Sequence, residues 1–192
     1  MREKGAELAE KYGDVIQQCF RSAYAHWFDK HRDELNIHRG RTRSNFVWDC
    51  TVGYLRTALG EDGKFRFIDT HGTTLMIYDQ SLLIKVKKLN RGLRASNVFT
   101  YASEKFNHQK DLGFELNLTN VFLGYVPNDL NTEIEQIHIV CPNGDGVAWS
   151  VPVTAPVSQR VIDFKSDEVV TVPRKRIKLR NPRERSSTKN GS

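Results

Sequence analysis

Hydrophobic residues near the N-terminus recur at three- and four-residue steps, the spacing that places them along one side of an α-helix. The clearest run predicts a helix over residues 6–31. A second run of the same period follows Ser44, a residue type that favours the start of a helix, and Gly60 favours its end. We therefore expect two N-terminal helices, joined by a charged connector over residues 33–43.

The hydrophobic period then changes to two, which is typical of strands with one buried face. Six segments show this alternation, and a short helix predicted over residues 100–108 separates the first three from the last three. Short links between neighbouring segments favour antiparallel hairpins. The predicted fold class is therefore α+β with an antiparallel sheet, in the order ααβββαβββ. The six strand segments are 64–70, 73–79, 82–89, 120–126, 134–141 and 146–153.

Charge divides the chain into two unequal parts. The formal net charge is +6, yet residues 1–156 carry 19 basic and 19 acidic side chains, so the whole excess lies in residues 157–192. This split predicts a single globular α+β domain over 1–156 and a basic, largely disordered C-terminal tail over 157–192. Short apolar runs and three widely spaced cysteines predict a cytoplasmic protein with free thiols and no membrane contact.

The tail contains the densest group of candidate binding residues. In an extended conformation four of its cations, at positions 174, 176, 178 and 180, would line one side, and the apolar residues at 177 and 179 would lie on the other. Such an arm can lie along nucleic-acid phosphates, or its apolar side can dock on a protein, or it can act only as a solubilising tail. The residues concerned are Arg174, Lys175, Arg176, Ile177, Lys178, Leu179 and Arg180.

Two further basic segments lie inside the neutral domain. If they converge in the fold, they form a positive face that attracts a polyanion; otherwise the lysines only protect a strand edge from aggregation. In the third strand segment, Lys85 and Lys87 alternate with apolar residues and should point to the opposite face. The candidate binding residues are Arg39, Arg41, Arg43, Lys85, Lys87, Lys88, Arg91 and Arg94.

Catalytic motifs give little support for an enzyme. The six histidines show no His-x3-His spacing and the three cysteines show no Cys-x2-Cys spacing, so neither a metal site nor a cofactor is predicted. A metal-independent ribonuclease, however, needs only a general acid or base beside cations. His38, with Arg41 close in the sequence, meets that minimal requirement and supplies the alternative hypothesis.

Three segments, 38–44, 87–97 and 140–144, resemble uncharacterised small bacterial proteins of mobile-element, toxin–antitoxin or phage-defence loci. The resemblance spans roughly residues 38–153 and contains no catalytic motif. It implies an antitoxin-like or defence-associated regulator whose protein partner would be a cognate toxin or a peptidase. Together with the charge pattern, it favours a non-enzymatic protein that binds a protein partner, nucleic acid or both. The ribonuclease and a purely structural protein are the alternatives.

Overall fold

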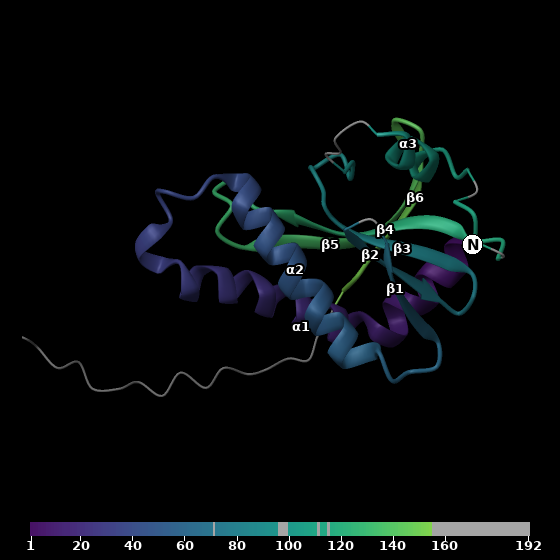
Figure 1. Ribbon diagram of the computed structural model, residues 1–192, viewed down its shortest axis with the longest axis horizontal. Coiled ribbons are helices and arrows are strands. Elements are labelled where there is room, and N and C mark those ends of the chain that lie inside the picture. Colours follow the sequence, from purple (N-terminus) through teal and green to yellow (C-terminus); the bar gives the residue numbers. More distant parts are fainter. Residues whose placement is uncertain (71, 96–99, 111, 115, 155–192) are drawn as a thin grey trace, which may run out of the picture. The chain divides into compact units, whose positions relative to one another are not determined.

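The computed structural model describes residues 1–70, 72–95, 100–110, 112–114 and 116–154, and its fold is α+β (Figure 1). Two long helices come first and six strands follow, with a short helix between the third and fourth strands. The helical elements are α1 (Arg2–Lys30), the 3-10 turn η1 (Arg32–Glu34), α2 (Gly40–Leu59) and α3 (Tyr101–Asn107). The strands are β1 (Phe65–Thr70), β2 (Thr73–Tyr78), β3 (Leu82–Lys88), β4 (Thr119–Pro127), β5 (Ile134–Asn143) and β6 (Gly146–Pro152).

The six strands form one sheet in their sequence order, β1-β2-β3-β4-β5-β6. Hairpins make four of the five pairings antiparallel, as the short links predict. The β3–β4 pairing is parallel, with Leu82 opposite Thr119 and Lys88 opposite Tyr125. The expectation of a wholly antiparallel sheet is therefore wrong at this one junction. The physical reason is the long connection through α3, which returns the chain to the end of the sheet where β3 began.

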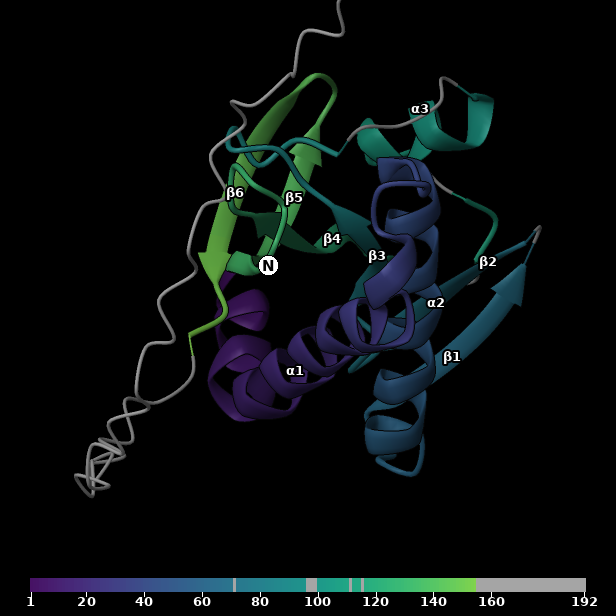
Figure 2. The same ribbon diagram turned by 90° about the vertical axis from the view of Figure 1, so that its left-hand side faces the viewer.

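The sheet has a core on each face. Helices α1 and α2 cover one face, where the apolar stripe of α1, including Ile16, Phe20 and Trp27, packs on the inward residues of the strands (Figure 2). The opposite face carries a smaller core, covered by α3 through Phe106 and by apolar residues between 112 and 118. None of the helices in the described ranges is long and apolar enough to cross a membrane.

Helix α2 begins earlier than its hydrophobic pattern predicts. Arg39, in an extended conformation, precedes its first residue, Gly40, so the helix start expected at Ser44 is wrong. The Ser44 hydroxyl instead donates to the carbonyl of Gly40 at 2.8 Å, inside the first turns of the helix. Because residues 40–43 are exposed or half-buried and mostly polar, this first turn lacks the apolar period that would have revealed it.

Gln109 fastens the segment after α3 to the sheet. Its amide nitrogen donates to the carbonyls of Asn120 at 2.9 Å and Pro142 at 3.0 Å, and its oxygen accepts from the Asn120 backbone at 2.8 Å. Asn120, which is buried, also donates from its side chain to the Phe106 carbonyl at 3.2 Å. These bonds satisfy polar groups that would otherwise be costly to bury, and they hold the α3 layer against β4 and β5.

Candidate functional site

A basic cleft lies where β2 and β3 separate. Their pairing ends at Leu75 and Lys85, although β2 begins at Thr73 and β3 continues to Lys88. Figure 2 shows the β1–β2 hairpin diverging from the rest of the sheet. The N-terminal half of α2 borders the opening, which has a volume of about 1080 Å³. The lining residues are Gly40, Arg41, Ser44, Asn45, Trp48, Asp49, Gly72, Thr73, Lys85, Val86, Lys87, Lys88 and Tyr125.

The cleft brings the two basic segments of the domain together. Arg41 lines it from α2, and the three lysines line it from β3. At one side, Asn131 connects the segments, because its backbone carbonyl accepts from the Arg43 guanidinium and its side-chain oxygen accepts from Lys88 Nζ, both at 3.0 Å. Docking of the start of α2 beside the end of β3 thus concentrates positive charge that is far apart in the sequence.

Lys85 and Lys87 are partly buried cations without an acidic partner among the described residues. Both project to the face opposite Val86, as their alternation predicts, and Lys85 Nζ lies 5.8 Å from the centre of the Phe106 ring. Burial, and next the charge of Lys85, lower the pKa of Lys87 to about 8. Burial likewise lowers the pKa of Lys85. Desolvated, unpaired cations in a cleft are characteristic of a site that receives an anion.

Four of the five arginines predicted in the domain lie outside the cleft lining: Arg43, described above, and three others. Arg91 forms an ion pair with Asp129 at 2.8 Å and approaches Glu135 at 4.0 Å. Arg94 lines a separate hollow of about 290 Å³ beside the β5–β6 turn, and Arg39 is the exposed residue before α2. The candidate residues of the tail fall outside the described residues: Arg174, Lys175, Arg176, Ile177, Lys178, Leu179 and Arg180.

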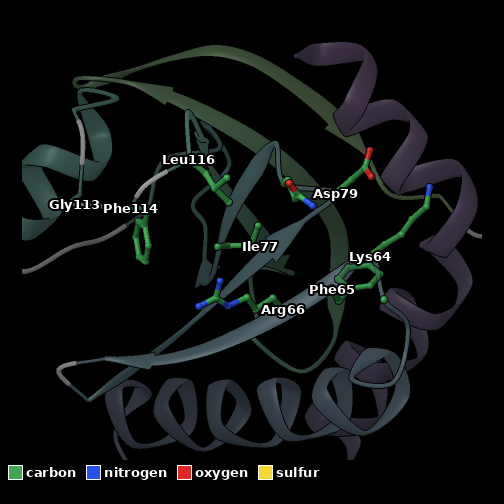
Figure 3. A pocket seen from close by; sticks show the side chains of 10 residues that line it. Lys64, Phe65, Arg66, Ile77, Asp79, Gly113, Phe114 and Leu116 are labelled. Carbon is green, nitrogen blue, oxygen red and sulfur yellow. The ribbon is translucent and has the colours of Figure 1, made fainter.

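A second pocket, of about 590 Å³, lies between β1, β2 and the residues Gly113, Phe114 and Leu116 (Figure 3). It also contains charged residues, but two of them have opposite partners nearby. Asp79 accepts from Lys4 at 2.7 Å, and Lys64 donates to Glu7 at 3.5 Å. Because these charges are compensated within the protein, this pocket has less excess charge to offer an anion than the basic cleft has.

His38 lies in a cluster of its own, in the connector between α1 and α2. Its Nε2 atom is 3.1 Å from a Glu34 carboxylate oxygen, and the same oxygen is 3.6 Å from Nδ1 of His31. His38 does not line the cleft that contains Arg41, so the two residues of the ribonuclease hypothesis do not share this pocket. The sequence did not reveal this cluster, because its pattern is His-x2-Glu-x3-His and matches neither His-x3-His nor Cys-x2-Cys spacing.

Comparison with protein-family models, with curated proteins and with solved structures gave no match.

Proposed function

We propose that this protein binds single-stranded nucleic acid in the basic cleft. The observation that carries the proposal is the partly buried pair Lys85 and Lys87, which lacks an acidic partner among the described residues, in a cleft also lined by Arg41. Holding such cations without counter-charges costs free energy, and an anion that enters the cleft recovers it.

The composition of the lining favours nucleic acid over a small anion. Lys85 and Lys87 lie two residues apart on one face of β3 and can contact successive phosphates, while Lys88 projects to the other face. The Arg41 guanidinium, on the α2 side of the opening, can bind a phosphate with two hydrogen bonds. Trp48, half-buried in the lining, offers an aromatic surface on which a base can stack. Stacking inside a cleft requires an unpaired base, which favours a single strand over a duplex.

Replacement of Lys87 by glutamine tests the cleft directly. Loss of one phosphate contact is expected to lower affinity for a labelled single-stranded oligonucleotide about five- to tenfold and to reduce the slope of log K against log salt by about 0.7. Fluorescence anisotropy of the full chain at several salt concentrations measures both quantities. The matched control is Lys11→Gln, which removes one exposed cation from α1 and should change affinity less than twofold.

Two results would contradict the cleft as the binding site. Equal losses in the Lys87 and Lys11 variants would indicate attraction by net charge alone. If the wild-type chain shows no detectable binding of the oligonucleotide, the proposed function is wrong. The tail remains a predicted additional contact with nucleic acid or a protein partner, and both lysine variants keep it intact.

The pH dependence of binding provides a second prediction. With a pKa of about 8, Lys87 is mostly charged at pH 7 and mostly neutral at pH 9. Because only the charged form binds phosphate well, wild-type affinity should fall about tenfold over this interval. Lys87→Arg, whose side chain stays charged, should lose less than threefold. Parallel pH profiles for the two proteins would show that Lys87 does not supply the titrating contact.

A further inference from the structure

The connector between α1 and α2 brings together three potential metal ligands. One ligand atom from each of His31, Glu34 and His38 lies within 4.8 Å of the other two. The Glu34 oxygen is 3.1 Å from Nε2 of His38 and 3.6 Å from Nδ1 of His31. Two ligands of a tetrahedral zinc ion, each at its usual bond length, are roughly 3.3 Å apart. Both measured separations are close to that value.

Local packing fixes the two imidazole rings before any ion binds. The Trp27 ring lies 4.3 Å from the His31 ring and 5.3 Å from the His38 ring, measured between centres, and the two histidine rings are 4.8 Å apart. Phe46 of α2 approaches His31 at 5.3 Å. Trp27 is only 2% exposed, so the rings rest on a rigid part of the core. A preorganised pair of this kind loses little conformational entropy on binding a metal.

The backbone of the connector places the third ligand. Glu34 ends the 3-10 turn η1, where its N–H donates to the His31 carbonyl at 3.0 Å, and its own carbonyl accepts from the His38 N–H at 3.3 Å. The Glu34 side chain is more than half exposed, at 58%, while those of His31 and His38 are 19% and 25% exposed. An ion can therefore enter from solvent and reach nitrogen atoms that face the carboxylate.

We propose that His31, Glu34 and His38 bind Zn²⁺. Two imidazole nitrogens and one carboxylate oxygen are ligands that suit this ion, and zinc sites with two histidines and one glutamate are known to keep a fourth position for water or another donor. The bound ion would tie the end of α1 to the residues just before α2. This proposal is independent of the basic cleft, because none of the three ligands lines it.

Cys50 and His26 form the main competing metal-binding pair among the described residues. The Cys50 sulfur lies 3.8 Å from Nδ1 of His26, and the Tyr54 hydroxyl lies 3.1 Å from the same nitrogen. Burial, with the charge of Asp49 as a lesser cause, raises the pKa of the Cys50 thiol, which disfavours the thiolate that zinc requires. A test of the proposed site must nevertheless distinguish it from this pair.

Isothermal titration calorimetry of the untagged, metal-free full chain with zinc chloride tests the site. The wild-type protein should bind one Zn²⁺ per chain, and both His38→Gln and Glu34→Gln should lower the affinity at least tenfold. His108→Gln, which changes an exposed histidine beside α3, and Cys50→Ser should each leave it within twofold. Circular dichroism of the metal-free variants checks that each retains the fold. Glu34→Gln is the safer variant, since this side chain is the most exposed of the three.

Cobalt(II) absorption provides an independent readout of the ligands. Nitrogen and oxygen ligands should give visible bands without the intense near-ultraviolet band of a cobalt–thiolate bond. The proposal is overturned if the wild-type chain binds no zinc, if the His31→Gln/His38→Gln double variant binds it with unchanged affinity, or if binding depends on Cys50.

Discussion

Replacement of Trp27 by alanine is expected to lower the free energy of unfolding by about 3–5 kcal/mol. Trp27 is among the largest fully buried side chains, and it joins the end of α1 to the start of α2 through Phe46, whose ring centre is 5.4 Å away. Alanine would leave a cavity that this junction of two helices and their connector cannot close. Denaturation in urea, monitored by circular dichroism, measures the loss.

Two further variants test whether the buried volume of Trp27 accounts for this loss of stability, one at Trp27 itself and one at the half-buried Trp48. Its indole N–H is buried without a hydrogen-bond partner in the described part of the chain. Trp27→Phe removes that N–H and keeps an aromatic ring, so it should cost less than half as much as alanine. Trp48→Ala should lower stability by only about 1–2 kcal/mol, because Trp48 is half-buried, while weakening oligonucleotide binding. A larger loss of stability at Trp48 than at Trp27 would contradict this assignment of roles.

Local periodicity explains why most of the fold could be predicted from the sequence. Each of the six strands begins and ends within two residues of its predicted bounds, because apolar alternation and short turns act over a few neighbouring residues. The turn that includes Gly144, where φ is +59°, is one such local feature between β5 and β6. The parallel β3–β4 junction depends instead on contacts between distant segments, for which no local pattern exists.

The candidate site was predictable only as a set of residue types. Charge clustering identified Arg41, Lys85 and Lys87, but their convergence depends on how α2 docks beside the end of β3. The same clustering included Arg91, whose charge is paired with Asp129 across a turn that lies far along the chain. Whether a cation is free or neutralised is a property of the tertiary structure. The sequence alone therefore could not separate these arginines and lysines.

Gly124→Val is the second substitution for which we expect a large effect, a loss of about 3 kcal/mol or more in the free energy of unfolding. Gly124 lies in β4, opposite Lys87 in the parallel register. A Cβ atom at this position would overlap the side chain of Leu89, which is 2% exposed and follows directly after β3. The close approach of Leu89 to the strand explains why glycine occupies a central position of the sheet.

Because Leu89 follows β3 directly, the overlap caused by a side chain at position 124 would also affect the cleft. Its N–H donates to the Tyr125 carbonyl at 2.8 Å, which continues the β3–β4 pairing beyond Lys88. A valine at 124 would push Leu89 outward and shift the end of β3, where Lys87 lines the cleft. We therefore expect Gly124→Val to weaken oligonucleotide binding as well as stability, even though residue 124 does not itself line the cleft.

A double-mutant cycle tests whether overlap with Leu89 causes the loss of stability expected for Gly124→Val. Leu89→Ala alone should cost about 2–5 kcal/mol through the cavity it leaves, but in combination with Gly124→Val the added methyl groups occupy that space. The double variant should therefore be more stable than the sum of the two single losses predicts, by at least about 1 kcal/mol. Gly53→Ala is the control: a Cβ there meets no atom within 4 Å, so this helical position should become more stable by about 0.5–1 kcal/mol. Additive losses at 89 and 124 would show that the space beside Gly124 is not what makes glycine necessary there.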